Sequence, residues 1–545
     1  MESKTFSVSG NIVDVVGKRI FQGTIRIKEG KISNITEEKT SSTDYILPGF
    51  IDAHVHIESS MLIPSEFARL AVVHGTVATV SDPHEIANVL GIDGVKFMIN
   101  NGKKVPFKFF FGAPSCVPAT PFETSGASIG IKEVNQLLAM EDINYLSEMM
   151  NFPGVLFKDA AVVEKLNLAK KYNKPVDGHA PGLKGKDALT YAQAGISTDH
   201  ECFTIEEATD KIKAGMKILI REGSAAKNFD ALVGLIEHYP ESIMFCSDDK
   251  HPNDLVDGHI NLLVKRAIAL GYDPITVLRI VSYNAVKHYH LNVGLIQPDD
   301  DADFIIASDL KNLEIKATYI KGQKVAGNGE TAINSIVEIP INAFNATSIT
   351  ASDIAVKAKG KMIKVQKAID GQLITELLTV NAKVRDGNVE SDIENDILKM
   401  VVLNRYQPSA PAVGFIHNFG LKHGAIASTV AHDSHNIIAV GTSDEEIVKV
   451  VNELINSNGG VCATYNNEIQ LLRLSVAGLM SDNDGYNVAL QYDLLDKTAK
   501  KLGCQLVAPF MTLSFMALLV IPSIKLSDKG LFDGNRFELT DLFTD

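Results

Sequence analysis

The chain has 545 residues, of which 45% are hydrophobic and 22% are charged, as expected for a soluble globular protein with more than one domain. Its formal net charge of −14 argues against a protein that binds nucleic acid or an anionic membrane. The N-terminus does not have the pattern of a signal peptide. The longest apolar run, residues 513–522, is too short to cross a membrane and is predicted to be a buried strand. Five scattered cysteines form no Cys-x-x-Cys pair, so we expect no disulfides, no thiolate zinc site and a cytoplasmic location.

Short strands separated by glycine turns begin the chain, and similar strands return after residue 300. These two β segments flank a longer region of different character. We therefore predict that residues 1–46 and residues 296–335 form one small β domain, into which the longer region is inserted.

The inserted region, residues 47–295, alternates apolar strands with helical stretches, which is typical of a parallel α/β fold. Eight strands are predicted, at residues 48–56, 75–82, 107–113, 144–148, 175–179, 196–200, 216–222 and 242–248. Eight βα units in roughly 250 residues match a (β/α)8 TIM-type barrel, in which active sites lie at the C-terminal ends of the strands. The predicted fold class is therefore α/β.

Residues 336–545 keep a globular composition and are predicted to form a C-terminal α+β domain. Ser443 is expected to cap a helix with an apolar stripe on one face, and Asn458 to end it. Strands are predicted at residues 382–385, 437–440 and 505–508.

Residues that can bind metal stand at the C-terminal ends of five of the predicted barrel strands. They are His54, His56, Glu148, His179, His200 and Asp248. Taken singly, a strand-end histidine is more often a hydrogen-bonded core residue, but that explanation does not account for the whole set. Side chains alternate along a strand, so His54 and His56 point to the same face. Four imidazoles and two carboxylates suit two divalent metals bridged by a carboxylate and a hydroxide.

These features resemble the amidohydrolase superfamily and, more closely, the bacterial adenine deaminases. The matching segments are residues 48–60, 81–88, 148–155, 177–182, 198–201, 246–252, 431–436 and 520–522. The His-x-His motif marks only the superfamily, whereas the other segments together are more specific and span nearly the whole chain. The resemblance implies hydrolytic deamination of adenine to hypoxanthine and ammonia in purine salvage, with two Mn2+ or Fe2+ ions; zinc is also accepted by such ligands.

The resemblance also implies a role for each candidate ligand. His54 and His56 would hold one metal, His179 and His200 would hold the other, and Glu148 would bridge the two. In the implied mechanism a metal-bridged hydroxide attacks C6 of adenine.

Two of these assignments have alternatives. Many superfamily members bridge their metals with a carboxylated lysine, for which Lys158 is the nearest candidate, although it follows a Pro-Gly turn. Asp248 is assigned as metal ligand and as the general base that passes a proton towards the leaving amine. Its neighbour Asp249 is the alternative, and Asp248 is favoured because the Ser-Asp pair matches the superfamily pattern.

The reaction also needs a group that protonates the purine ring nitrogen during attack. Glu85 and His84, at the end of the second predicted strand, are the candidates for this role. The alternative is that Glu85 is only a first-turn acid at a helix start.

A polar cluster at residues 432–435 has the composition of a nucleophilic triad, but adjacent side chains cannot meet in that geometry. We expect a polar loop near the barrel mouth. This loop either faces the substrate or forms an accessory metal site, and the alternative is a plain surface loop. The zinc deaminases of the His/Cys/Cys type are excluded because the chain has no Cys-x-x-Cys pair.

Two other functions are retained as alternatives. One is an amidohydrolase that acts on another aminopurine or on a cyclic amide, and the other is a metal-free scaffold protein. The expected partner is a small purine base, without nucleic acid or membrane, and a homodimer is the default expectation.

Overall fold

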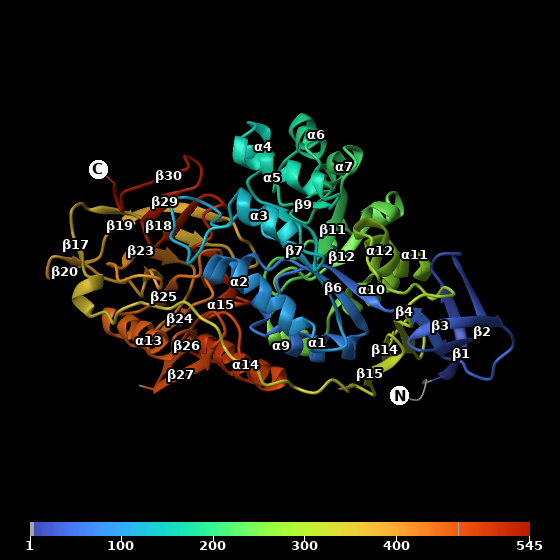
Figure 1. The fold of residues 1–545 in the computed structure, drawn as a ribbon. Coiled ribbons are helices and arrows are strands. Elements are labelled where there is room, and N and C mark those ends of the chain that lie inside the picture. Colours follow the sequence, from blue (N-terminus) through green and yellow to red (C-terminus); the bar gives the residue numbers. More distant parts are fainter. Residues whose placement is uncertain (1–4, 467, 545) are drawn as a thin grey trace.

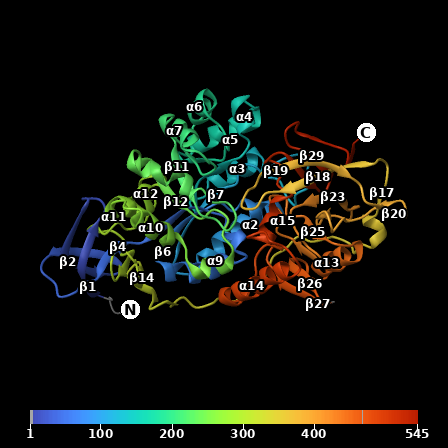
Figure 2. The ribbon, with the colours of Figure 1, turned by 180° about the vertical axis from the view of Figure 1, so that it is seen from behind.

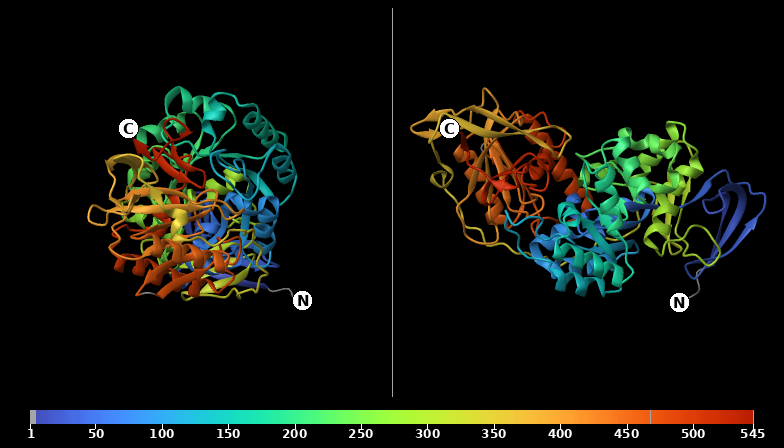
Figure 3. Two further views of the ribbon diagram at one scale, coloured as in Figure 1. Left: turned by 90° about the vertical axis from the view of Figure 1, so that its left-hand side faces the viewer. Right: turned by 90° about the horizontal axis from the view of Figure 1, so that it is seen from above.

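The computed structural model describes residues 5–466 and 468–544 of the chain. Figure 1 shows the N-terminal strands at one end of the molecule and the C-terminal strands at the other, with the parallel strands between them. The view from behind in Figure 2 and the right-hand view of Figure 3 show the same order, while the left-hand view of Figure 3 looks at the molecule from its C-terminal end. Within the described ranges, no helix is long and apolar enough to cross a membrane.

One antiparallel-rich sheet is assembled from both flanks of the central region. Its eight strands are β1 (Thr5–Asp14), β2 (Arg19–Lys28), β3 (Lys31–Glu37), β4 (Tyr45–Pro48), β13 (Phe304–Ala307), β14 (Ile315–Ile320), β15 (Gln323–Gly327) and β16 (Glu330–Thr331). Strands β4 and β13 pair antiparallel, with Phe304 opposite Pro48. Residues that precede and follow the central region therefore share one sheet.

The central region contains two parallel sheets, of five and three strands. The strands are β5 (Phe50–Val55), β6 (Thr76–Ser81), β7 (Lys108–Ala113), β8 (Ile143–Met149), β9 (Val176–Gly178), β10 (Thr198–Asp199), β11 (Lys217–Arg221) and β12 (Ile243–Cys246). Each of these strands overlaps one of the predicted strand ranges. Their largely apolar sequences are buried on both faces, as in a parallel sheet covered by helices.

Backbone hydrogen bonds link the two parallel sheets at both junctions. The Ser197 amide, just before β10, donates to the Val176 carbonyl of β9 over 2.9 Å. At the other junction the Asp248 amide donates to the His54 carbonyl over 3.0 Å, and the His56 amide donates to the Asp248 carbonyl over 3.2 Å. The C-terminal ends of β5 and β12 are thereby held side by side.

Helices alternate with these strands. They are α1 (Pro64–Ala71), α2 (His84–Gly102), α3 (Ile131–Leu138), α4 (Phe152–Leu156), α5 (Ala160–Lys171), α6 (Gly185–Gln193), α7 (Ile205–Lys213), α8 (Phe229–Leu232), α9 (Pro252–Asp257), α10 (Ile260–Ala269), α11 (Pro274–Leu278) and α12 (Asn284–Tyr289). Helix α5 shows why they start where they do: the Asp159 carboxylate accepts from the amides of Ala161 and Val162, which would otherwise lack partners.

The C-terminal part of the chain contains both strands and helices, and nine of its strands form one sheet. Its strands are β17 (Val356–Lys357), β18 (Met362–Ala368), β19 (Thr375–Asn381), β20 (Val384–Arg385), β21 (Asn388–Val389), β22 (Ile397–Leu403), β23 (Ala412–His417), β24 (Ala425–Ser428), β25 (Ile437–Gly441), β26 (Gly460–Tyr465), β27 (Glu468–Arg473), β28 (Ile524–Ser527), β29 (Gly530–Asp533), β30 (Glu538–Leu539) and β31 (Phe543–Thr544). Its helices are α13 (Asp444–Ser457), α14 (Gly485–Lys501) and α15 (Pro509–Phe515).

Helix α13 has the ends that its sequence predicts. The Ser443 hydroxyl accepts a hydrogen bond of 3.3 Å from the Glu446 amide, and Asn458 follows the helix with a φ of 55°. The apolar stripe of the helix is buried against β24, β25 and β26. Local capping and periodicity therefore define this element.

Two strand predictions in the C-terminal part are wrong. Residues 505–508 form no strand, and residues 513–522 begin inside helix α15 and continue through turns. A short apolar run fits a buried strand and a buried helix equally well, because no polar face reveals its period. Pro509 at the first turn of α15 favours the helix.

Candidate metal centre and active site

The six predicted ligand candidates lie together at the C-terminal ends of the central strands. They are His54, His56, Glu148, His179, His200 and Asp248, and all are buried. Each belongs to at least one group of ligand atoms that lie within 4.8 Å of one another. The structure thus brings the whole predicted set into one place.

The first group joins the two histidines of β5 to the residue that follows β12. The Nε2 atoms of His54 and His56 are 3.2 Å apart. Both nitrogens face Oδ1 of Asp248, at 3.5 Å from His54 and 3.3 Å from His56. Two imidazole nitrogens and a carboxylate oxygen therefore converge on one point, which suits a divalent cation.

The second group gathers around Glu148 at the end of β8. Its Oε2 lies 3.0 Å from Nδ1 of His179 and 3.1 Å from Nε2 of His200. Burial raises the pKa of Glu148, but the neighbouring imidazoles of His179 and His200 bring it well below its ordinary value. Burial lowers the pKa of His179, while the carboxylates of Glu201 and Glu148 raise it to about 9. The site therefore favours an ionised carboxylate facing cationic partners.

Glu148 lies between the two groups. Its Oε1 is 3.7 Å from Nε2 of His56, and its Oε2 is 4.0 Å from Nε2 of His54. Oε2 faces His54, His179 and His200 while Oε1 faces His56, so the Glu148 carboxylate contacts imidazoles of both groups. The donor set, imidazole and carboxylate only, fits two divalent metal ions of the manganese, iron or zinc kind.

Two charged residues of the site were not predicted from the sequence. Arg221, the last residue of β11, donates to both carboxylate oxygens of Glu201 and, over 2.5 Å, to Oδ2 of Asp248. Burial raises the pKa of Asp248, but Arg221 and the two β5 histidines bring it well below its ordinary value. Glu201 directly follows His200, and Arg221 is the penultimate residue of the strand predicted at residues 216–222, so their positions near strand ends were the available signal.

Of the two alternative residues, Asp249 lines one cavity together with five of the six ligand candidates. Oδ1 of Asp249 accepts a hydrogen bond of 2.5 Å from the Ser59 hydroxyl. Burial and the neighbouring Asp248 raise the pKa of Asp249. Lys158 is exposed in the turn between α4 and α5 and belongs to none of the ligand groups named above.

His84 and Glu85 begin helix α2 and line the same cavity. Nδ1 of His84 lies 3.2 Å from Oδ2 of Asp82 and 3.5 Å from Oε1 of Glu148. Its Nε2 lies 3.4 Å from Oε1 of Glu85. His84 therefore connects the ligand groups to Glu85, and Asp82 and His84 form a further potential ligand group with His56 and Glu148.

The cluster at residues 432–435 is not a plain surface loop, because all four residues are buried. Nδ1 of His432 and Nε2 of His435 each contact a different carboxylate oxygen of Glu85. The loop therefore reaches from the C-terminal part of the chain to the start of α2. Five residues from this part line the catalytic cavity: Leu373, His432, Asp433, Phe515 and Leu518.

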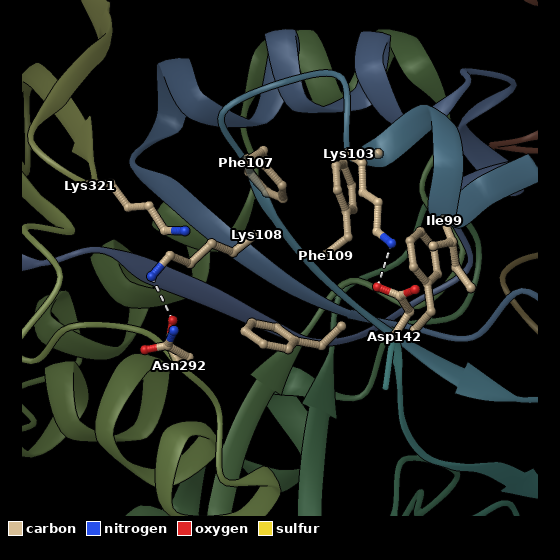
Figure 4. A pocket seen from close by; sticks show the side chains of 11 residues that line it. Ile99, Lys103, Phe107, Lys108, Phe109, Asp142, Asn292 and Lys321 are labelled. Carbon is tan, nitrogen blue, oxygen red and sulfur yellow. Dashed lines mark hydrogen bonds and ion pairs between the residues drawn. The ribbon is translucent and has the colours of Figure 1, made fainter. Parts of the chain in front are cut away.

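A larger cavity of about 220 Å³ lies elsewhere in the central region. Figure 4 shows its aromatic and lysine side chains. Lys103 pairs with Asp142 over 2.6 Å, and Lys108 donates to the Asn292 carbonyl over 2.5 Å. Lys108 also pairs with Asp303 of the flanking sheet. These pairings join parts of the fold, and none of the ligand candidates lines this cavity, so the candidate active site is the separate cavity beside the ligand groups.

Two families match the chain. Residues 45–325 match the Amidohydrolase family, and residues 372–538 match the Adenine deaminase C-terminal domain. The first match covers the central strands with all six ligand candidates. The second covers the residues that contact Glu85 and line the cavity from the other side.

Curated relatives match the chain over nearly its whole length. An adenine deaminase of Methanosarcina mazei is 52% identical over 98% of this chain and 99% of its own. An adenine deaminase of Sulfurovum sp. is 54% identical over the same shares, and one of Salinibacter ruber is 51% identical over 99% of both chains. These organisms include an archaeon as well as bacteria, so the resemblance extends beyond the bacterial enzymes.

Proposed function

This chain belongs to the adenine deaminases of the amidohydrolase family, and we propose from that membership a reaction carried out by the residues at the strand ends. The enzyme hydrolyses adenine to hypoxanthine and ammonia, a step of purine salvage. The observation that carries this conclusion is identity of about one half to adenine deaminases along the entire chain.

The proposed architecture has three domains. Strands β5 to β12 would close into a (β/α)8 barrel over residues 47–295, supported by the hydrogen bonds at both sheet junctions. Residues 1–46 with 296–335 would form the small β domain, and residues 336–545 the C-terminal α+β domain. The ligand candidates then lie at the end of the barrel where active sites occur in this fold.

Two divalent ions are proposed to bind at the strand ends, manganese or iron first and zinc as an alternative. His54 and His56 would hold one ion and His179 and His200 the other, with Glu148 shared between them. Such ions would supply Lewis acidity, which makes hydroxide available from water near neutral pH.

Asp248 is proposed as the general base of the reaction. Its Oδ1 faces the histidine pair, while Arg221 holds Oδ2, so the carboxylate is ionised and fixed in direction. It would accept a proton from the oxygen that adds to C6 and pass it to the amino group, which leaves as ammonia. Glu85 and His84 are proposed to handle the proton at the ring nitrogen, because both line the cavity beside the ligand groups.

The C-terminal side of the cavity is proposed to bind the flat purine. Leu373, Phe515 and Leu518 provide apolar surface opposite the charged ligands, as expected for a site that sandwiches an aromatic ring. The exclusion of water by this wall would strengthen the electrostatic interactions of the site.

Purified enzyme loaded with Mn2+ should release one ammonia per adenine consumed. The absorbance should change at the same time from that of adenine to that of hypoxanthine. Preferred turnover of another aminopurine or of a cyclic amide would favour the first alternative function. A metal content below one equivalent together with no turnover would favour the scaffold alternative.

We further propose that the enzyme works as a homodimer in the cytoplasm. The five cysteines are free and buried in the structure, which suits a reducing compartment. Light scattering of the purified enzyme would give a mass of twice the chain mass of 59.1 kDa if the dimer is correct.

A further inference from the structure

We infer that His432 is a catalytic residue that donates the proton accepted by the ring nitrogen N1 when water adds to C6 of adenine, and that Glu85 is its positioning residue. This inference rests on the proposed function. It gives the C-terminal part of the chain a role in proton transfer, in addition to its role in lining the cavity. It also separates the two candidates at the start of α2, because Glu85 would act through His432.

Glu85 lines the cavity, but its carboxylate is held by two histidines of the C-terminal part of the chain. Both of its carboxylate oxygens are engaged, one by Nδ1 of His432 and the other by Nε2 of His435. All three side chains are buried. A carboxylate bound at both oxygens orients its partners instead of exchanging protons with a ligand.

The contacts of His432 leave one ring nitrogen for the cavity. Nδ1 is occupied by Glu85, the ring stacks on Phe515 at a centroid distance of 5.1 Å, and the residue lines the catalytic cavity. Burial lowers the pKa of His432, while Glu85 and Asp249 raise it to about 9. A protonated imidazole that binds Glu85 through Nδ1 would present its second proton, on Nε2, to the cavity.

The same three residues also resemble a metal site, which is the accessory-metal alternative for this loop. The tautomer of His435 argues against it. The Ala431 amide donates to Nδ1 of His435 over 3.2 Å, so Nδ1 carries a lone pair and the proton of a neutral ring is on Nε2. A protonated Nε2 donates to Glu85 and cannot bind a cation. Burial lowers the pKa of His435 to about 4, which keeps the ring neutral.

Addition of water forms the C6–O bond and moves the electron pair of the C6–N1 double bond onto N1, where the Nε2 proton of His432 is transferred. One proton of the water passes through Asp248 to the amino group, the C6–N bond breaks and ammonia leaves. The other proton of the water recharges His432, and the transferred proton remains on N1 of hypoxanthine.

The test compares His432→Asn, Glu85→Gln and the control His417→Asn, which replaces a partly exposed histidine of β23. For each full-length enzyme, kcat and KM for adenine, metal content and thermal midpoint are measured. We expect the first two variants to lose about 10²- to 10⁴-fold in kcat, with KM and metal content unchanged. The control should match the wild type.

A second readout is chemical rescue. Imidazole added to His432→Ala should restore part of kcat, because it can occupy the vacated space and donate a proton, whereas Glu85→Gln should not respond. A His432→Asn enzyme within about threefold of wild-type kcat would overturn the inference. A wild-type enzyme with three metal equivalents, one of them lost in both variants, would overturn it in favour of the accessory metal. Failure of the wild type to turn over adenine would instead contradict the proposed function.

Discussion

Arg221 donates a hydrogen bond of 2.5 Å to Asp248, and both side chains are buried. The interaction fixes Oδ2 of the carboxylate and leaves Oδ1 to face the histidine pair. The same guanidinium binds Glu201 through two nitrogens. A planar fork that serves two carboxylates at once is a property of arginine that lysine lacks.

Arg221→Lys should therefore lower kcat for adenine more than it raises KM, because the general base loses its orientation. Arg221→Met should also reduce the free energy of unfolding by about 3–5 kcal/mol, since it leaves two buried carboxylates without their partner. Steady-state kinetics and urea unfolding test the two effects. An Arg221→Lys enzyme with wild-type kcat would contradict the orienting role.

Glu148→Gln should lower metal content and activity together, because an amide is a poor bridge between two cations. Lys158→Ala is the matched control and should change neither, since that side chain is exposed. Metal analysis and ammonia release on the same preparations measure both quantities. The reverse pattern would identify a carboxylated lysine as the bridge.

Asp248→Asn should retain most of the metal but lose about 10²- to 10⁴-fold in kcat, as expected for removal of a general base. Asp249→Asn should lose less, because Asp249 faces Ser59 instead of the histidine pair. The comparison requires kcat values at equal metal content. A larger loss in the Asp249 variant would exchange the two assignments.

Lys525 gives a prediction on pH and stability. Its ammonium donates to the carbonyls of Leu373 and Phe515, two residues of the cavity wall, over 2.6 and 2.9 Å. Burial lowers its pKa from 10.5 to about 7. Between these pH values the unfolded chain binds a proton that the folded chain does not, so this group makes the free energy of unfolding rise with pH. Below about pH 7 Lys525 is protonated in both states, and the folded protein bears the full free-energy cost of burying the ammonium.

Lys525→Met removes this titration. The free energy of unfolding of the wild type relative to the variant should increase by at most about 1.4 kcal/mol per pH unit from pH 7 to pH 9. The exposed Lys529→Met, in the next turn, is the control and should show no such slope. Urea unfolding at three pH values measures the difference. Parallel pH profiles for the wild type and Lys525→Met would show that the amine titrates normally.

The central strands and the ligand candidates at their ends were predictable because the local signals agree. Each strand is a short apolar run between turns, and the candidate metal ligands stand directly at the strand ends. His54 and His56 share a face by strand geometry alone. Glu148 lies between the ligand groups, a position consistent with the predicted bridge.

The remaining parts of the site depend on contacts that the sequence does not encode locally. Arg221 lies next to the end of a predicted strand, but its partners depend on which strands are neighbours in the fold. His432 contacts Glu85 although the two residues are 347 positions apart in the sequence, and local periodicity does not predict such a contact. The apolar run at residues 513–522 was misassigned for a different reason, since a fully buried segment has no polar face from which its period can be determined.

The C-terminal part of the chain contributes three apolar residues to the cavity, Leu373, Phe515 and Leu518, beside His432 and Asp433. These three apolar positions can therefore change during evolution without altering the residues at the strand ends. Substitutions at Leu373, Phe515 or Leu518 would alter which heterocycle is accepted while the residues at the strand ends keep the hydrolytic chemistry intact. Directed evolution towards new aminopurines would accordingly begin with libraries at these three wall positions.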